Sequence, residues 1–126
     1  MERRRSMEPS NPVIQLCMAG TRAEFEHRID EARLLYDQAW EARTDDYDAC
    51  VAAHYVARFQ DTAVKSLYWN QLALTHANAV NDERVREVYP SLYLSLGCSH
   101  ELAGNQGESQ RYYNLAADLG FIHQRE

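Results

Sequence analysis

Three short segments of this chain resemble one another, and their spacing constrains the fold more than any other feature. They centre on Tyr36, Trp69 and Tyr113, and in each the aromatic residue is followed by Asp or Asn and then by a short apolar step. Trp69 follows Tyr36 by 33 residues, and Tyr113 follows Trp69 by 44. Self-similarity at periods of this size is typical of stacked helical hairpins. The spacing therefore predicts a chain built from successive helix pairs.

The composition favours the same fold class. Only three prolines and five glycines interrupt the 126 residues, and 45% of the residues are hydrophobic. Strong helix formers are abundant, and the alternating β-branched runs that predict strands are absent. We expect an all-α, antiparallel helix-hairpin stack of about five to six helices, forming one domain over residues 11–126. Residues 1–10, which contain three consecutive arginines, are predicted to be a flexible basic and polar tail.

Start and stop signals, together with apolar residues at steps of three and four, predict the helix boundaries. Thr21 and Glu24 have the form of a capping box, so we expect a helix to start there after a stop at Gly20. Pro90 either starts a helix or kinks one, and helical spacing on both sides of it favours a kinked helix. The predicted helices cover residues 13–19, 21–43, 46–59, 62–80, 83–103 and 106–119.

Charge and apolar patterning disfavour several functional classes. The net charge of −6 argues against nucleic-acid binding, which needs a basic surface. No apolar run approaches the ~20 residues that span a bilayer, so no membrane contact is expected. The N-terminus lacks the apolar segment of a secretory signal. Three cysteines at wide spacing indicate reduced thiols and a cytoplasmic protein.

Residues 93–104, which precede the segment around Tyr113, resemble the first helix of the tetratricopeptide repeat. Leu96 and Gly97 match the Leu-Gly pair in the first helix of that family. The small, aromatic and Ala positions of the second helix correspond here to Ser109, Tyr113 and Ala116. Gly97 and Ala116 are expected to let the two helices approach closely, while Tyr113 fills the gap beneath them.

The register extends to the two earlier units. In the second unit Ala53 takes the glycine position and Trp69 the tyrosine position. In the first unit the matching residues are Gly20, Ala32, Tyr36 and Ala39. The resulting units cover residues 13–43, 45–80 and 83–120, and their predicted packing residues are Tyr36, Trp69, Gly97, Tyr113 and Ala116.

The resemblance implies a right-handed stack of helix pairs whose first helices line a concave groove. Proteins of this family usually bind peptides or partner proteins, so we expect an interaction scaffold with a protein or peptide partner and no cofactor. The groove positions implied by the register are Tyr47, Cys50, His54 and Arg58 on one helix, and Ser91, Leu94, Cys98 and Glu101 on the next.

Two of these residue types invite a chemical interpretation. Cys50 and His54 lie four residues apart, with Cys98 expected opposite them, so they resemble zinc ligands or a cysteine nucleophile with a histidine base. The sequence has no CxxC or HxxxH pair and no evident oxyanion loop or orienting acid. A packing role is therefore the simpler interpretation, and we expect neither a metal site nor enzymatic activity.

The end of the chain leaves an alternative function open. Repeat arrays normally end in a polar capping helix. Here the last helix and the residues after it carry Tyr112, Leu115, Leu119, Phe121 and Ile122. A self-associating structural or regulatory domain, for example a homodimer, is therefore the alternative to a partner-binding scaffold.

Overall fold

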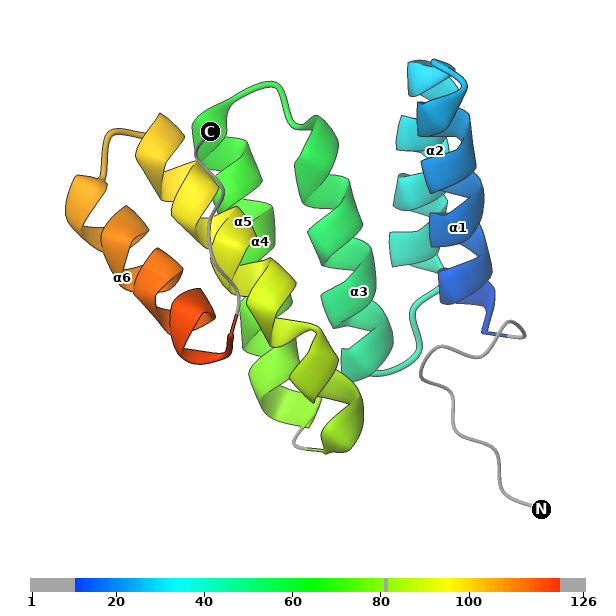
Figure 1. Ribbon diagram of the computed structural model, residues 1–126. Coiled ribbons are helices and arrows are strands. Elements are labelled where there is room, and N and C mark those ends of the chain that lie inside the picture. Colours follow the sequence, from blue (N-terminus) through cyan, green and yellow to red (C-terminus); the bar gives the residue numbers. More distant parts are fainter. Residues whose placement is uncertain (1–10, 81, 121–126) are drawn as a thin grey trace.

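The computed structural model describes residues 11–80 and 82–120, and in this part of the chain every regular element is a helix (Figure 1). The elements are α1 (Pro12–Phe25), α2 (Ile29–Glu41), α3 (Asp46–Val56), the 3₁₀ helix η1 (Ala57–Phe59), α4 (Ala63–Val80), the 3₁₀ helix η2 (Glu83–Glu87), α5 (Tyr89–Leu102) and α6 (Gln106–Asp118). The predictions of an all-α fold and of five to six helices are confirmed. The predicted tail, residues 1–10, lies outside the described residues.

Helix α1 starts where the sequence predicts and ends later. Its N-cap is Asn11, whose side-chain oxygen accepts a hydrogen bond from Val13 N at 2.9 Å. The predicted stop at Gly20 is wrong, because the helix continues through this glycine to Phe25. Gly20 instead leaves room for the Tyr36 ring of α2 to pack against α1.

The predicted capping box at Thr21 is also wrong. The Thr21 hydroxyl donates a hydrogen bond to Cys17 O at 3.0 Å inside α1 and caps no new helix. The chain reverses over residues 26–28, where His27 has a φ of 64°, a left-handed conformation that few non-glycine residues adopt. Helix α2 therefore begins at Ile29.

The kinked helix predicted across Pro90 is not observed. Residues 83–87 form η2, which Asp82 caps by accepting a hydrogen bond from Arg84 N at 2.9 Å. Helix α5 then starts at Tyr89 with Pro90 in its first turn, where a missing N–H costs no helical hydrogen bond. The helices predicted over 46–59, 62–80 and 106–119 have nearly the predicted ends.

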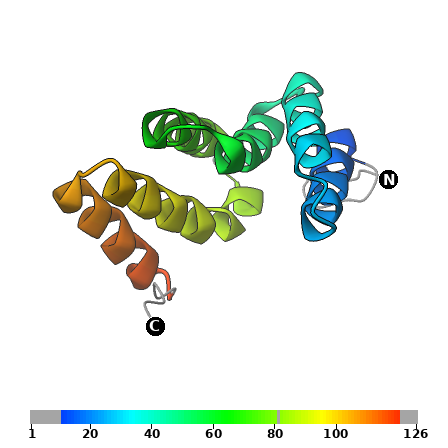
Figure 2. The ribbon, with the colours of Figure 1, turned by 90° about the horizontal axis from the view of Figure 1, so that it is seen from above.

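The helices pack as three consecutive pairs, α1 with α2, α3 with α4, and α5 with α6. Helix α2 also contacts α3, and α4 contacts α5, so neighbouring pairs are joined. Seen from above, the pairs follow one another along a curve, with α1 and α2 at one end and α6 at the other (Figure 2).

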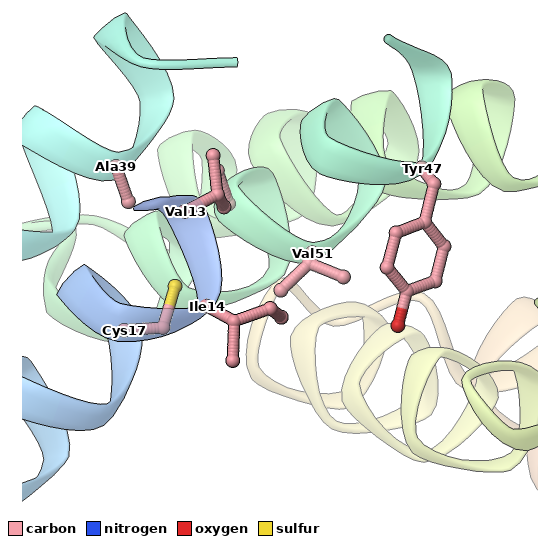
Figure 3. Packing of buried hydrophobic residues seen from close by; sticks show 7 residues of the cluster. Val13, Ile14, Cys17, Ala39, Tyr47 and Val51 are labelled. Carbon is pink, nitrogen blue, oxygen red and sulfur yellow. The ribbon is translucent and has the colours of Figure 1, made fainter. Parts of the chain in front are cut away.

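Small residues dominate the contacts between these helices. The buried cluster where α1, α2 and α3 meet consists of Val13, Ile14, Cys17, Ala39, Tyr47, Val51 and Ala52 (Figure 3). The cluster where α3, α4, η2 and α5 meet consists of Cys50, Ala53, Ala73, Ala77, Val85 and Leu92. Short side chains let the helix axes approach closely, and aromatic residues such as Tyr47 and Trp40 fill the remaining space at the cluster edges.

In the two outer pairs a glycine of the first helix lies against a tyrosine of the second. A Cβ added to Gly20 would lie 2.4 Å from Cε1 of Tyr36, and one added to Gly97 would lie 2.5 Å from Cε1 of Tyr113. Ala116, one turn after Tyr113, is fully buried. Because glycine has no Cβ, each tyrosine ring packs directly against the backbone of the opposite helix.

The middle pair has the same register as the outer pairs, but the residue at the tyrosine position is Asn70 and not the predicted Trp69. Asn70 is the eighth residue of α4, as Tyr36 is of α2 and Tyr113 of α6. Asn70 is only 3% exposed. Trp69, the predicted equivalent, is one position out and packs edge-on against Trp40 of α2, with ring centroids 5.1 Å apart.

The residue opposite Asn70 in the middle pair is correspondingly His54. It is the sixth residue from the end of η1, as Gly20 is the sixth from the end of α1. The predicted glycine equivalent, Ala53, is therefore also one position out. The middle pair places a large residue on its first helix and a small one on its second, which reverses the order in the outer pairs.

Candidate partner-binding groove

Two adjoining hollows lie along the first helices of the three pairs, and His54 lines both. The first, which we call the groove, has a volume of about 240 Å³. It receives residues from α1, α3, η2 and the start of α5. These residues are Ile14, Cys17, Met18, Tyr47, Val51, His54, Tyr55, Arg84, Glu87, Val88 and Ser91.

The second hollow, which we call the side pocket, has a volume of about 260 Å³. It lies where α3 and η1 of one pair, the α4 of that pair and the α5 of the next pair meet. Its lining residues are His54, Ala57, Arg58, Ser66, Asn70, Leu94, Ser95, Cys98, Ser99 and Leu102.

The groove combines apolar walls with a charged rim. Met18 of α1 is 57% exposed and offers a flexible apolar contact. On the opposite side, the Arg84 guanidinium carbon lies 4.9 Å from the centre of the Tyr47 ring. The same guanidinium forms an ion pair with Asp82, with a nitrogen–oxygen distance of 2.9 Å. Burial raises the pKa of Tyr47 to about 12, so its phenol is neutral. Glu87 supplies the opposite charge near Arg84.

The inner wall of the side pocket is polar and internally hydrogen-bonded. Asn70 Nδ2 donates to Ser99 Oγ at 3.0 Å, and the Ser66 hydroxyl donates to Ala57 O at 3.1 Å. His54 Nδ1 and Asn70 Oδ1 are both buried, and the Asn70 side chain acts on the His54 ring as a neighbouring hydrogen-bond acceptor.

The mouth of the side pocket is exposed. Leu102 is 77% exposed, and Cys98 is a free, exposed thiol. Arg58 reaches from η1 to form an ion pair with Glu24 of α1. The side pocket therefore has an apolar and cationic entrance and a polar inner wall.

The electrostatic environment keeps His54 uncharged. Burial lowers the pKa of its imidazole to about 4, the positive charge of Arg58 acts in the same direction, and the neighbouring Asn70 amide opposes both. The ordinary value for histidine is about 6.5. Near neutral pH the His54 ring is therefore a neutral donor and acceptor on the wall shared by both hollows.

This depressed pKa predicts a specific loss of stability in acid. Below pH 6.5 the unfolded chain protonates His54 while the folded chain does so only near pH 4, so the unfolded state binds more protons and stability falls as pH falls. From pH 7 to pH 5 the free energy of unfolding should drop by about 2 kcal/mol more in the wild type than in His54→Gln. Urea unfolding of both proteins at the two pH values measures this difference. Equal drops in the two proteins would contradict the depressed pKa.

The structure divides the predicted groove residues between the two hollows. Tyr47, His54 and Ser91 line the groove. Arg58, Leu94 and Cys98, again with His54, line the side pocket. Two predicted residues line neither hollow: Cys50 is completely buried between α3 and its neighbours, and Glu101 accepts a 2.9 Å hydrogen bond from the Tyr113 hydroxyl.

The chemical roles considered for Cys50 find little support in its surroundings. Burial raises the pKa of the Cys50 thiol to about 12, so the thiolate that a nucleophile or a zinc ligand needs is scarce at neutral pH. Cys98 shares the side pocket with His54, but Cys50 does not line it. Among the described residues, no group of three His, Cys, Asp or Glu side chains is placed to hold a metal ion.

Asn70, which lines the side pocket, is not among the residues that the sequence pattern predicts for the site. A signal was present: Ser66, Asn70 and Ala73 follow one another at steps of four and three, as Ala32, Tyr36 and Ala39 do. The aromatic match at Trp69 obscured it. The sequence pattern also does not predict the groove residues Met18, Arg84 and Glu87. Arg84 and Glu87 belong to the 3₁₀ helix η2, whereas the sequence predicts one long helix over residues 83–103.

No family model, curated protein or solved structure matches this chain. Within residues 11–80 and 82–120, no helix is both long and apolar enough to cross a bilayer. The two hollows are therefore interpreted from their own geometry and chemistry.

Proposed function

We propose that this protein is a tetratricopeptide-like interaction module whose groove binds an extended segment of a partner protein. One observation carries the proposal: a single hollow is lined by the first helices of all three pairs, α1, α3 and α5, together with η2. A surface formed by successive helices of a curved stack is the kind of surface that helical-repeat proteins use for extended partners.

The chemistry of the groove indicates what the segment contains. Its apolar wall, which includes Ile14, Val51 and Val88, suits one or two apolar side chains. Arg84 and Glu87 at the rim provide one cation and one anion, so flanking polar residues of the partner are accommodated on the same side. The neutral ring of His54 is a further polar group in the lining. We propose binding without catalysis and without a cofactor.

Self-association is the alternative function. Of the apolar residues of α6 and its end that suggest it, only some are exposed. Tyr112 and Tyr113 are buried against α5 and are 5% and 7% exposed. Leu119, at the end of α6, is 51% exposed. Phe121 and Ile122 lie outside the described residues. A concentration-dependent mass in sedimentation experiments that Leu119→Glu abolishes would favour this alternative.

The groove is tested by peptide selection with a blocked variant. Peptides selected from a random phage-displayed library on the full chain should lose at least about tenfold in affinity for Ser91→Trp, because an indole on this exposed groove position occupies the space of an apolar anchor. Fluorescence anisotropy of labelled peptides measures the affinities. Ala79→Trp, on an exposed position of α4 outside both hollows, is the matched control and should bind as the wild type does.

The two variants must melt at similar temperatures for the comparison to hold, which circular dichroism checks. Selected peptides that bind Ser91→Trp as tightly as the wild type would contradict the groove assignment. A loss of affinity shared by Ala79→Trp would contradict it as well, because the effect would then not be local to the groove.

A further inference from the structure

Helix α4 carries almost no charge, although one side of it faces outward. Its 18 residues include a single charged side chain, Lys65, whereas the 13 residues of α2 include five and the 13 residues of α6 include three. The second helices of the outer pairs therefore have the polar surface expected of helices that face water, and α4 does not. Depletion of charge together with an exposed aromatic residue is typical of the core of a protein–protein interface.

The outward side of α4 forms one continuous surface, which we call the α4 stripe. Its members share one helix face and are Val64, Tyr68, Gln71, Leu72, Thr75 and Ala79. Val64 is 69% exposed and Tyr68 is 60% exposed, and the other members are exposed or half-buried. The opposite side of the helix contains its buried residues, Asn70, Ala73 and Ala77. Helix α4 (green) lies on the outer side of the curve that the helix pairs follow (Figure 2).

Several polar groups on and beside the α4 stripe already have partners within the chain. The Thr75 hydroxyl donates a hydrogen bond to Gln71 O at 3.1 Å, so it needs no partner from outside. Asn78 accepts a hydrogen bond from the Tyr89 hydroxyl at 2.5 Å, and His76 Nδ1 lies 2.8 Å from a carboxylate oxygen of α3. Because burying an unpaired polar group costs free energy, these bonds lower the cost of covering α4.

The α4 stripe is complementary to itself when two copies lie antiparallel. Its large exposed side chains, Val64 and Tyr68, are in the first half of the helix, and its small ones, Thr75 and Ala79, are in the second half. A two-fold axis between positions 71 and 72 places Val64 opposite Ala79 of the second copy. The same axis places Tyr68 opposite Thr75. Large side chains that face small ones let helices interdigitate, and two Gln71 amides near the axis can donate to and accept from each other.

We infer that this protein forms a two-fold symmetric dimer in which the α4 stripe packs antiparallel against the α4 stripe of a second copy. A contact of this kind uses one patch twice and closes on itself, so it does not extend into fibres. No residue of α4 lines the groove, so both grooves stay open in the dimer. The dimer does not depend on the proposed function, but the two together give a scaffold with two binding grooves.

The charges around the α4 stripe disfavour other occupants. Helices that lie on an anionic membrane surface have polar faces rich in Lys and Arg. Lys65 is the only such residue of α4, and the charged residues of α2 are mostly acidic. A stripe without charges also offers no ion pair by which a charged partner segment would be selected. An equally uncharged surface of matching shape, such as a second α4 stripe, fits best.

The size of the α4 stripe sets the expected strength of the dimer. An 18-residue helix is about 27 Å long. A contact of one helix per chain is at the small end of specific interfaces, which bury about 1,200–2,000 Å² in total. We therefore expect a dissociation constant of about 10–100 µM. In sedimentation velocity between about 1 µM and about 1 mM, the mean mass of the full chain should rise from one chain to two. The mass of one chain throughout this range would overturn the inference.

Variants on exposed positions locate the contact without threatening the fold. Tyr68→Glu should raise the dissociation constant of the dimer at least about thirtyfold, because it removes a central ring and brings two carboxylates into the contact. Tyr68→Phe keeps the ring and should dimerise as the wild type does. Leu34→Glu is the matched control, because Leu34 is 56% exposed and is the sixth residue of α2, as Tyr68 is of α4.

Three outcomes of these variants would overturn the inference. The first is a Tyr68→Glu protein that dimerises as the wild type does, and the second is a Leu34→Glu protein that loses the dimer. The third is a dimer that Leu119→Glu abolishes and Tyr68→Glu does not, because the contact would then be at the end of α6. Circular dichroism checks that all variants melt at similar temperatures.

Cross-linking tests the antiparallel register. The background is Cys98→Ser, in which the two remaining cysteines are buried. Gln71→Cys then places a thiol beside the two-fold axis, so a short bis-maleimide should link two chains. Val64→Cys alone should link poorly, because positions 64 and 79 are about 22 Å apart along the helix. A mixture of Val64→Cys and Ala79→Cys chains should link well. Val64→Cys chains that link to one another as well as to Ala79→Cys chains would overturn the antiparallel contact.

The two tryptophan variants of the peptide experiment separate the dimer from the proposed function. Ala79→Trp fills the space that faces Val64 of the second copy, so it should weaken the dimer while peptide affinity stays unchanged. Ser91→Trp should lose peptide affinity while it dimerises as the wild type does. A Ser91→Trp protein that is monomeric, or an Ala79→Trp protein that dimerises as the wild type does, would overturn the α4 contact. Neither result would bear on the groove.

Discussion

Gly20→Ala is expected to lower the free energy of unfolding by about 3 kcal/mol, because overpacking a core costs roughly 1–3 kcal/mol and here the neighbour cannot move away. The new Cβ would lie 2.4 Å from Cε1 of Tyr36. The Tyr36 ring stacks on Tyr55 and Phe59, and its hydroxyl donates a hydrogen bond to Glu24. Urea unfolding followed by circular dichroism measures the change.

Two controls make this result specific. Gly107→Ala, in the first turn of α6, places its Cβ in open space and should leave stability unchanged or raise it by up to about 1 kcal/mol. In a Tyr36→Asn background, Gly20→Ala should cost much less than in the wild type, because the ring that it displaces is absent. Additive costs of the two substitutions would show that the clash with Tyr36 is not the cause.

Replacing Asp48 with alanine is expected to cost about 4 kcal/mol, since hydrogen bonds to a buried charge contribute roughly 1.5–3 kcal/mol each. The carboxylate is fully buried and accepts hydrogen bonds from Asn11 Nδ2 at 3.1 Å, from Thr44 N at 3.1 Å and from Thr44 Oγ1 at 2.9 Å. It thereby ties the start of α1 and the α2–α3 loop to α3. Thermal and urea unfolding measure the loss.

Asp48→Asn and Asp37→Ala complete the comparison. The asparagine keeps the shape but replaces one acceptor oxygen with a donor, so it should lose at least about 2 kcal/mol. Asp37 is exposed on α2, and its substitution should change stability by no more than about 0.5 kcal/mol. A cost of Asp48→Ala no larger than that of Asp37→Ala would contradict the role of the buried carboxylate.

The sequence predicts the helices well where local signals act alone and misplaces them where tertiary contacts decide. Asp45 caps α3 by accepting a hydrogen bond from Asp48 N at 2.8 Å, and such a bond between neighbouring residues is encoded in the local sequence. Gly20 has the same local appearance as a helix stop. Its role is set by Tyr36, which lies in the next helix and which no local pattern around Gly20 reveals.

Of the residues that the sequence assigns to a groove, the structure brings some together and separates others. The register of the repeat resemblance assigns His54, Leu94 and Cys98 to facing helices, and in the structure these three residues line the side pocket. Residues on one helix face stay together once the helix is formed. The partner of His54 across the middle pair depends on a register shift of one residue. Trp69 matches the aromatic pattern by type, whereas Asn70 matches it by position, and only burial distinguishes the two.

The unequal burial of the three thiols gives the protein a built-in attachment point for a reporter group. Cys17 and Cys50 are buried, and burial raises the pKa of each to about 12, so neither should react with a maleimide in the folded state. Cys98 is exposed at the mouth of the side pocket. An environment-sensitive dye coupled to the unmodified sequence would therefore sit at one position, where its emission responds directly to whatever enters the pocket.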